Sequence, residues 1–354
     1  MKSVDYIIVG QGLAGTLLAH DLLENNQSVL IIDKPHAAMA SRVAAGLFNP
    51  VGVKRCIRSW RADDFLPVAI ERYKFLEEKL GATFLNIKPI FRLFANEDNR
   101  KQWQVKCSNE GMDEFIGDFN PPNTHIYLKD DFGGASIFPA GSLEVVKFLD
   151  DSRFFFKRND CLLEENFNFD LLEKDAGVYK GIQAKKIIFC EGFQAIHNPH
   201  FKYLPFSPTK GEVLTIRIPT LEKMDKIVSK GIYIISLGNH LYRVGATFNH
   251  HEWNDLVTSE GIAYLQEKIE QILEEEYEVV SEKAGVRPTV RDRKPFLGEH
   301  PKYKKLAVFN GLGTRGVIQG PYLSAHFTAF LIDSEKIHQE VDIQRFISFS
   351  QAVK

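Results

Sequence analysis

Residues 4–15, "VDYIIVGQGLAG", decide how the first part of the chain folds. The first six of these residues are mostly apolar, which predicts a strand buried on both faces. Gly10, Gly12 and Gly15 then follow in the GxGxxG spacing. In that spacing the glycines allow a tight turn, a close approach of the backbone to a pyrophosphate, and close packing of a helix on the strand. The stretch therefore predicts a strand, a turn and a helix that together bind a dinucleotide.

The next residues complete this unit. Leucines repeat at helical spacing in "TLLAHDLLENN" at 16–26, and "SVLIID" at 28–33 predicts a second strand that ends at Asp33. An acid at this distance from the glycines accepts hydrogen bonds from a ribose, and the helix N-terminus offers free N–H groups to a pyrophosphate. The complete order favours a dinucleotide site over a structural βαβ turn, but it does not separate FAD from NAD.

The composition limits the class of protein. A chain of 354 residues is too long for one simple core, so two substructures are expected. The net charge of -2 gives no reason to expect nucleic acid or an anionic membrane as a partner. The four cysteines lack CxxC spacing and the histidine pairs lack a third ligand, so neither a disulfide framework nor a metal site is predicted. No stretch is long and apolar enough for a membrane span, and too few residues precede the first strand for a signal peptide. The expected location is the cytoplasm.

The segment "ASRVAAGLFNP" at 40–50 favours FAD. An NAD enzyme normally continues directly into further βαβ units, whereas an extended FAD needs chain along its length. Ser41 and Arg42 are predicted to contact phosphate and ribitol oxygens, with the arginine as a fixed charged donor. Ala45 and Gly46 would keep the backbone close to the flat flavin ring. The alternative is an ordinary surface loop.

With four later stretches, this pattern resembles the glycine oxidase and D-amino-acid oxidase family of FAD-dependent oxidoreductases. Those stretches are "AKKIIFCEGFQA" (184–195), "SPTKGEV" (207–213), "AGVRPTVRDRKPFLG" (284–298) and "FNGLGTRGVIQGP" (309–321). The first is similar to the second FAD segment of the family, but Cys190-Glu191-Gly192 departs from its usual small-small-Gly pattern. The third is the most specific of the four.

The resemblance implies an α/β fold, α+β overall, in which a Rossmann-like FAD-binding domain is interleaved with a β-rich, antiparallel-sheet substrate domain. The FAD-binding domain is expected to comprise 1–80, 137–208 and 282–354. The substrate domain is expected to comprise 81–136 and 209–281.

Local signals predict several further elements. Ser142 is a candidate N-cap for a helix over "LEVVKFL". Gly238-Asn239 fits a hairpin turn between two strands. An amphipathic helix is expected over 260–277, and a last long helix over 316–333.

The family resemblance also implies the chemistry. A neutral amine or amino acid would pass a hydride from its C–N carbon to flavin N5, and the imine would hydrolyse in water. Arg287 matches the arginine that binds the substrate carboxylate, and Arg315 a second arginine near the flavin. Tyr233 matches a substrate-binding tyrosine and Phe248 an apolar lining residue. The alternatives are structural: a salt-bridged Arg287, an Arg315 that only ties down its loop, and core roles for the two aromatic residues.

The predicted FAD is non-covalent, because no family-type cysteine or histidine stands out for attachment. The predicted cofactor-binding residues are Gly10, Gly12, Leu13, Ala14, Gly15, Asp33, Lys34, Ser41, Arg42, Ala45, Gly46, Leu47, Gly192, Gly313, Thr314, Arg315, Gly316 and Val317. The basic residues Lys54, Arg55, Arg58 and Arg61 favour a solvated face over a site for an acidic substrate.

Other functions remain open at this point. The stretch "SRVAAGLFNP" also resembles the oxidase domain that acts on carboxymethylaminomethyl-uridine in tRNA, although the net charge is not that of an RNA binder. A non-catalytic FAD-binding protein and an NAD dehydrogenase are further alternatives. The expected partners are a small amine or amino acid and an electron acceptor, which is oxygen or another molecule.

Overall fold

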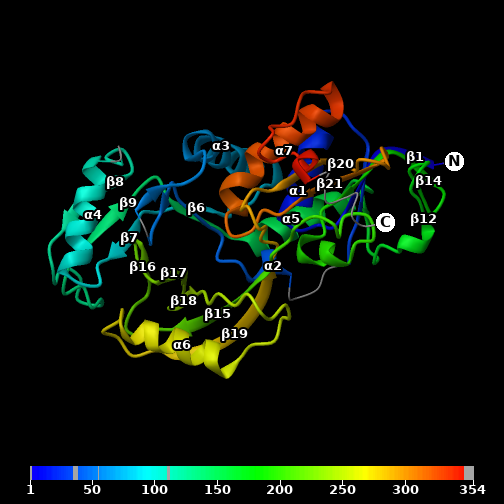
Figure 1. Ribbon diagram of the computed structural model, residues 1–354. Helices are drawn as coiled ribbons and strands as arrows, with labels where there is room; N and C mark the ends of the chain where they lie inside the picture. The colour runs from blue at the N-terminus through cyan, green and yellow to red at the C-terminus, as the bar shows by residue number, and fades with distance from the viewer. Residues whose placement is uncertain (1, 35–38, 55, 110–111, 347–354) are drawn as a thin grey trace.

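The computed structural model describes residues 2–34, 39–54, 56–109 and 112–346. Two large β-sheets form two lobes (Figure 1). The first and last described elements, β1 (Lys2–Val9) and the 3-10 helix η3 (Ile343–Phe346), lie in the same lobe.

The first lobe is built on a mostly parallel sheet. Its main order is β11 (Leu162–Leu163), β2 (Val29–Ile32), β1 (Lys2–Val9), β14 (Ile182–Phe189), β13 (Val178–Tyr179) and β12 (Leu172–Glu173). Strand β21 (Leu306–Asn310) also pairs with β14 in parallel, and β20 (Phe296–Glu299) is antiparallel to β21. Strands β11, β2, β1, β14 and β21 are therefore a Rossmann-like parallel core.

Strand β1 is buried on both faces, as its sequence predicts. Tyr6 and Ile8 pack into one core, and Ile7 and Val9 into another. Helices α1 (Leu13–Glu24), α5 (Val145–Arg158) and α7 (Gly316–Asp333) contribute to the core around Tyr6 and Ile8. Helix α3 (Ala62–Leu80) packs against α7.

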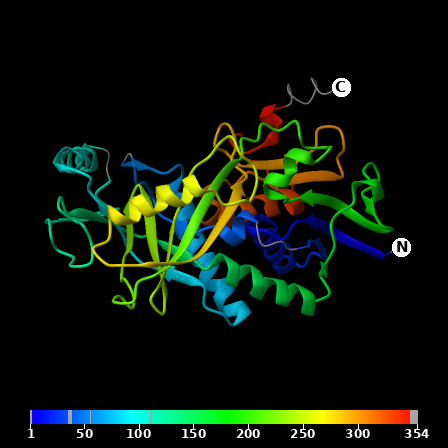
Figure 2. The ribbon, with the colours of Figure 1, turned by 90° about the horizontal axis from the view of Figure 1, so that it is seen from below.

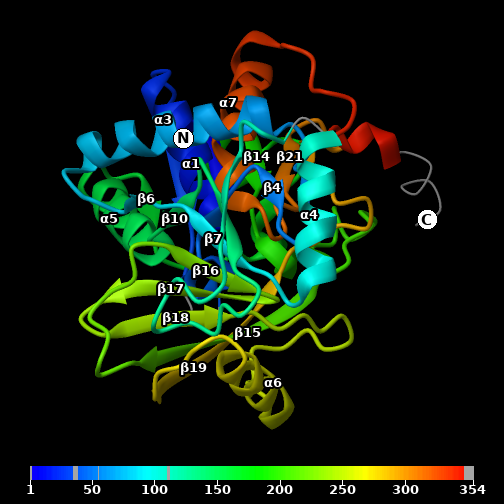
Figure 3. The ribbon, with the colours of Figure 1, turned by 90° about the vertical axis from the view of Figure 1, so that its left-hand side faces the viewer.

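The second lobe is built on an eight-stranded sheet. Its order is β19 (Glu278–Arg287), β15 (Thr209–Arg217), β18 (Leu241–Gly245), β17 (Ile232–Gly238), β16 (Ile227–Lys230), β7 (Ile90–Leu93), β9 (Gly134–Ile137) and β8 (Ile116–Asn120). All neighbours are antiparallel except β16 and β7. Helix α6 (Ser259–Glu270) lies across one face (Figure 2), and α4 (Glu97–Asn109) stands at the β7–β9 end (Figure 3).

Short elements complete the chain. They are α2 (Ala40–Val43), a three-stranded sheet of β3 (Leu47–Phe48), β10 (Gly141–Leu143) and β6 (Leu85–Ile87), the pair β4 (Val51–Gly52) and β5 (Ile57–Arg58), and the 3-10 helices η1 (Phe169–Leu171), η2 (Gly192–His197) and η3 (Ile343–Phe346). The segment 40–50, which the sequence analysis placed along FAD, thus contains α2 and β3. No helix in the described part of the chain is long and apolar enough to cross a membrane.

The predicted fold class, a Rossmann-like domain combined with an antiparallel sheet, is confirmed. The expected domain boundary at 281/282 falls inside β19, which belongs to the antiparallel sheet along its whole length. Strand β6, from the expected substrate domain, pairs with β10 rather than with the large antiparallel sheet.

Of the predictions for single elements, some are confirmed and others are wrong. The predicted N-cap at Ser142 is wrong, because Ser142 lies in β10 and α5 follows Glu144. The helix expected over 260–277 ends at Glu270. The hairpin is confirmed, but its turn lies one residue later than predicted: Gly238 ends β17, and Asn239 and His240 take φ values of 52° and 62° before β18 begins. The helix over 316–333 is confirmed as α7.

Candidate functional site

A cavity of about 1150 Å³ lies between the two lobes. Its walls come from the turn between β1 and α1, the end of β2, the segment around α2, the strands of the antiparallel sheet, and the turn before α7. Ligand pockets commonly measure about 300–1,000 Å³, so this cavity has room for a large cofactor and a substrate together.

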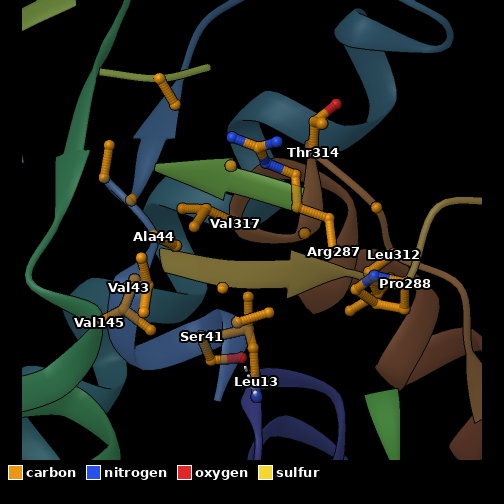
Figure 4. A pocket seen from close by; sticks show the side chains of 18 of the residues that line it. Leu13, Ser41, Val43, Ala44, Val145, Arg287, Pro288, Leu312, Thr314 and Val317 are labelled. Atoms are coloured by element: carbon orange, nitrogen blue, oxygen red, sulfur yellow. Dashed lines mark hydrogen bonds between the residues drawn. The ribbon is translucent and has the colours of Figure 1, made fainter. Parts of the chain in front are cut away.

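Most of the predicted site residues line this cavity. Those that do are Gly10, Gly12, Leu13, Ala14, Asp33, Lys34, Ser41, Ala45, Gly46, Leu47, Gly192, Tyr233, Phe248, Arg287, Gly313, Thr314, Gly316 and Val317. In Figure 4, Ser41 and Leu13 lie on one side of the view, and Arg287 and Thr314 on the other. The structure therefore brings residues from distant motifs into one space. Gly15, Arg42 and Arg315 are not among its lining residues.

The N-terminus of α1 faces the cavity, and its N-cap residue has no side chain that could cap it. Gly12 is the N-cap residue, and the Leu13 N–H donates to Ser41 Oγ at 3.2 Å (Figure 4). A Cβ built on Gly12 would contact only Ser41 Oγ at 3.5 Å and a Met39 methyl group at 3.9 Å. The backbone is therefore open to a ligand, and the helix N-terminus is suited to a pyrophosphate.

Gly10 and Gly15 serve the packing of this turn. Gly10 has φ +102°, and a Cβ on it would lie 2.6 Å from the carbonyl oxygen of Cys190. A Cβ on Gly15 would collide with the carbonyl oxygen of Gly10. Gly15 thus lets α1 pack against the turn, as its place in the motif predicts, and it does not face the cavity.

Asp33 is held by a network that the sequence motifs did not reveal. Its Oδ1 accepts from the Gln11 N–H at 3.0 Å, and its Oδ2 accepts from Arg153 Nη1 at 2.9 Å. The same Nη1 donates to Gln11 Oε1 at 2.6 Å, and Arg153 also pairs with Glu164 at 2.8 Å. Arg153 is a positioning residue for Asp33. It lies in α5, far along the chain, and no local motif marks it.

Two of the predicted arginines have other partners. Arg42 forms an ion pair with Asp150 on α5. Arg315 donates to Ser59 Oγ, and burial lowers the pKa of its guanidinium. This bond ties the turn before α7 to the segment after β5. This hydrogen bond supports the alternative in which Arg315 holds its own loop in place. Contact of Arg315 with the cavity has no such support, because Arg315 is not among the lining residues.

Arg287, by contrast, presents its guanidinium to the cavity. Its Nη1 donates to the backbone oxygens of Lys210 and Thr247, each at 3.3 Å. The group lies 4.5 Å from the centre of the Phe248 ring and directly over Gly211, where a Cβ would collide with it. Within the described residues it has no carboxylate partner at ion-pair distance. Burial lowers its pKa, but the pKa of a guanidinium lies so far above 7 that the group stays charged at neutral pH.

Tyr233 lies on the same side of the sheet as Arg287. Its hydroxyl reaches over Gly245, at 3.0 Å from the position of a Cβ built there. Burial raises the pKa of Tyr233 to about 12, and the positive charge of Arg287 opposes this rise. The phenol therefore remains protonated at neutral pH and can donate a hydrogen bond.

Glu191 is a lining residue that the sequence marked only as a departure from a family pattern. Asn198 Nδ2 donates to its Oε2 at 2.6 Å, and burial raises the pKa of its carboxyl to about 7. Burial likewise raises the pKa of the neighbouring Cys190 thiol. Both groups are thus shifted toward their neutral forms.

The basic segment divides in two. Lys54 lines the cavity, whereas Arg58 pairs with Asp63 and Glu114, the latter at 2.6 Å. Arg61 pairs with Asp64 at 2.7 Å and donates to the hydroxyl of Tyr322 at 2.9 Å. Arg55 lies outside the described residues. The paired arginines agree with the predicted solvated face, and Lys54 does not. In the part of the chain that the structure describes, no group of three or more acidic, histidine or cysteine side chains could hold a metal ion.

Comparison with known proteins identifies the family. The family described as FAD dependent oxidoreductase, DAO, matches residues 5–330. The chain belongs to this family. It is an FAD-dependent oxidoreductase, which argues against the NAD alternative.

Its relatives include glycine oxidases. The Bacillus subtilis enzyme is 24% identical over 359 residues, covering 94% of each chain. The Geobacillus kaustophilus enzyme is 28% identical over 132 residues, which span 36% of this chain and only 35% of that protein. The crystal structure of glycine oxidase from the same organism has a TM-score of 0.80 with 21% identity and covers 98% of both chains. That likeness shows the shared fold.

A second kind of relative is a bifunctional protein of tRNA 5-methylaminomethyl-2-thiouridine biosynthesis from Leptospira interrogans. It is 21% identical over 392 residues, which cover 96% of this chain. The match spans 59% of that protein, so the chain corresponds to a little over half of its length.

Proposed function

We propose that this protein oxidises the C–N bond of an amino acid, or of an amine that carries a carboxylate, with non-covalently bound FAD as the oxidant. The observation that carries this proposal is the guanidinium of Arg287. It is exposed to the cavity, it is charged, and no acid in the described residues neutralises it. A carboxylate is the group that such a fork of donors binds best.

The cavity fits FAD on the side of the parallel sheet. The open backbone at Gly12, the N-terminus of α1 and the acid at Asp33 suit the pyrophosphate and ribose of a dinucleotide. Gly192 adds a second open position, since a Cβ there would meet no atom within 4 Å. FAD, when bound, supplies the hydride acceptor. Cys190 is the lining cysteine, and its raised pKa makes it a poor nucleophile, which supports non-covalent binding.

The protein's own groups then bind and orient the substrate. Arg287 would hold the carboxylate in a bidentate pair, and the protonated Tyr233 would donate a hydrogen bond to it. The Phe248 ring, packed on the guanidinium, limits how far Arg287 can swing. This arrangement would fix the substrate carbon relative to the cofactor, and it would need no acid–base pair, because the amine would react in its neutral form.

The test is anaerobic titration of the FAD-loaded protein with glycine, sarcosine, D-amino acids and proline, followed by absorbance of the flavin. One of these amines, or a larger amine with a carboxylate, is expected to bleach the flavin bands. Arg287→Met should raise the substrate concentration needed for half-bleaching by roughly 10- to 100-fold, and Arg287→Lys by less. The matched control is Arg291→Met, a nearby exposed arginine that does not line the cavity.

The proposal fails if no carboxylated amine bleaches the flavin, which would favour a non-catalytic FAD-binding protein. It also fails if Arg287→Met bleaches as readily as the unchanged protein. Reoxidation in air, compared with reoxidation by a quinone, then assigns the electron acceptor.

The similarity to the bifunctional tRNA-modifying protein favours one alternative, a carboxymethylaminomethyl-type base as the substrate. That group is a secondary amine with a carboxylate, which Arg287 would bind equally well. Bleaching by a tRNA carrying this base, with affinity that falls steeply as salt rises, is the expected sign.

A further inference from the structure

The charged side chains that line the cavity are divided unevenly between the lobes. The acids Asp33, Glu165 and Glu191 all belong to the FAD-binding side, together with one cation, Lys34. The antiparallel sheet and its helix contribute only cations, namely Arg92, Lys230, Lys268 and Arg287, and Lys54 adds another from the segment after β4. A cavity wall with one sign of charge attracts the opposite sign. Lys268 and Lys230 have acids nearby, Glu267 and Asp131, so one substrate carboxylate on Arg287 would leave Arg92 as the cation without a counterion among the described residues.

Arg92 faces the same space as the proposed substrate-binding residues. It pairs in register with Ser229, which pairs with Tyr233, which in turn pairs with Gly245. Residues opposite each other on neighbouring strands point to the same face of a sheet, and all four of these residues line the cavity. Arg92 and Tyr233 are two strands apart, so their backbones are separated by about 10 Å.

The guanidinium of Arg92 is buried without a counterion. The residue is only 7% exposed, and no acid of the described chain lies at ion-pair distance from it. Its Nη1 donates to the Leu93 oxygen and its Nη2 to Asn99 Oδ1 at 3.4 Å, but its Nε has no partner. The Trp103 ring, 5.9 Å away, compensates only in part. Burial lowers its pKa to about 10, so it is still charged at neutral pH. An unpaired buried charge is costly, and a ligand anion would remove that cost.

Two lysines reinforce the positive charge at this end. Lys230 ends β16 at the hairpin tip, where its Nζ donates to the Gln271 oxygen at 3.1 Å. Burial lowers the pKa of Lys230, and the charges of Arg92, Lys129 and Lys268 lower it further, whereas Asp131 raises it. Lys268 on α6 donates to Gln271 Oε1 at 3.0 Å and lies 3.5 Å from Glu267. Lys230 follows Ser229 in β16, so it points to the face of the sheet that α6 covers, and the two lysines act on Arg92 only from the rim, at the hairpin tip.

We infer that Arg92, with Lys230 and Lys268 at the rim, forms a second anion-binding subsite of this cavity. The subsite takes a carboxylate or phosphate at the end of the substrate remote from the carboxylate on Arg287. This inference rests on the proposed function for the Arg287 end alone. The substrate class becomes an amino acid or secondary amine with two anionic ends, and a compound as small as glycine would fill only one end of the site.

The test uses probes that bind without reacting. These are thioethers of mercaptoacetate, in which sulfur replaces the oxidisable nitrogen, with a methylene chain of increasing length and a terminal carboxylate, phosphate or neutral carboxamide. Calorimetric titration of the FAD-loaded full chain gives their dissociation constants. At the chain length that spans the cavity, one of the charged ends should bind roughly 10- to 100-fold more tightly than the carboxamide. The carboxylate and phosphate series distinguish the two sources of the anion.

The variants assign that gain to the subsite. Arg92→Gln should abolish it and Arg92→Lys should retain part of it. The matched control Lys101→Gln removes an exposed charge of α4 outside the cavity and should leave the gain unchanged. Lys230→Gln, at the rim, should reduce the extra affinity for the charged probes. This variant tests the subsite if the Arg92 variants fold poorly.

Equal binding of charged and neutral ends at every chain length overturns the inference. The inference is also overturned if the charged probes still bind more tightly than the carboxamide in both Arg92→Gln and Lys230→Gln. Failure of the proposed function would give a different result. Amines would then leave the flavin unbleached, while these thioethers could still bind as expected.

Discussion

The guanidinium of Arg287 occupies space that is free because a residue of the neighbouring strand is glycine and has no Cβ. Gly211, in the neighbouring strand β15, sits directly beneath the guanidinium. We predict that Gly211→Ala displaces Arg287 and raises the KM for the amine substrate by roughly 10- to 100-fold, since a misplacement of about 1 Å costs this much. The measurement is steady-state kinetics with FAD content determined in parallel. FAD content should not change.

The matched control for this substitution is Gly117→Ala in β8. A Cβ there would make ordinary contacts, the nearest at 3.7 Å, so kinetics should stay as they are. An unchanged KM in Gly211→Ala would show that Arg287 does not need its present position.

The carboxyl of Glu191 makes stability depend on pH. Its pKa in the folded protein is about 7, against a usual 4.5, because burial disfavours the carboxylate. Between these pH values the folded state keeps a proton that the unfolded state has lost. Stability therefore falls as pH rises from 4.5 through 7, by about 1.4 kcal/mol per pH unit and up to about 3 kcal/mol in total.

We accordingly predict that Glu191→Gln stabilises the protein at pH 8. It should have little effect at pH 4.5, because the loss of stability caused by the raised pKa of Glu191 begins only above this pH. Urea unfolding at the two pH values measures the difference. The exposed Glu78→Gln in α3 serves as the control and should change stability little at either pH. An effect of Glu191→Gln that is equal at pH 4.5 and pH 8 would contradict the raised pKa.

At the scale of elements, the sequence predicted best where neighbouring residues decide the structure. The unit from β1 through α1 to β2, the helix α7 and the hairpin at Gly238 all depend on local spacing and turn residues. Ser142 shows the opposite case. Its local signal favours a helix N-cap, but Gly141–Leu143 pairs with β3 and β6, and such pairing between distant segments overrides local preference. Helix α6 likewise ends early, where Leu273 bridges to Leu128.

The same limit applies to the site. Residues within motifs, such as Gly12 and Ser41, lie at the cavity where the pattern places them. Arg153 reaches Asp33 across 120 positions of sequence, and Arg92 comes beside Ser229 only through strand pairing. Neither relation leaves a local pattern, because tertiary packing alone creates it.

The hairpin between β17 and β18 gives a prediction for an element. Asn239 and His240 both have positive φ, as the two central residues of a type I′ turn require. A left-handed conformation is costly for histidine and free for glycine. His240→Gly should therefore stabilise the protein by about 0.5–1 kcal/mol. Urea unfolding should show a higher midpoint with an unchanged slope. Ser236→Gly, inside β17, is the contrasting control and should destabilise it.

At the scale of the whole molecule, the cavity joins the two lobes, so its ligand should hold them together. The segment around α2 and the turn before α7 both line it, along with strands from the antiparallel sheet. Since FAD would bind only the folded chain, a concentration of 100 times its dissociation constant adds about 2.7 kcal/mol to the free energy of unfolding. For a chain of this length that corresponds to a shift in Tm of roughly a few degrees.

We predict that removing FAD lowers Tm by this amount and that Tm rises again with the logarithm of added FAD. Hydrogen exchange should become faster in 39–47 and 310–317 when FAD is absent, because these segments lose their contact with the ligand. Gly12→Ala provides the matched variant. Its Cβ meets no protein atom closer than 3.5 Å, yet it would project into the space proposed for the pyrophosphate. The variant should therefore keep the Tm of the FAD-free protein and lose the shift. A full FAD-dependent shift in Gly12→Ala would place the pyrophosphate elsewhere in the cavity.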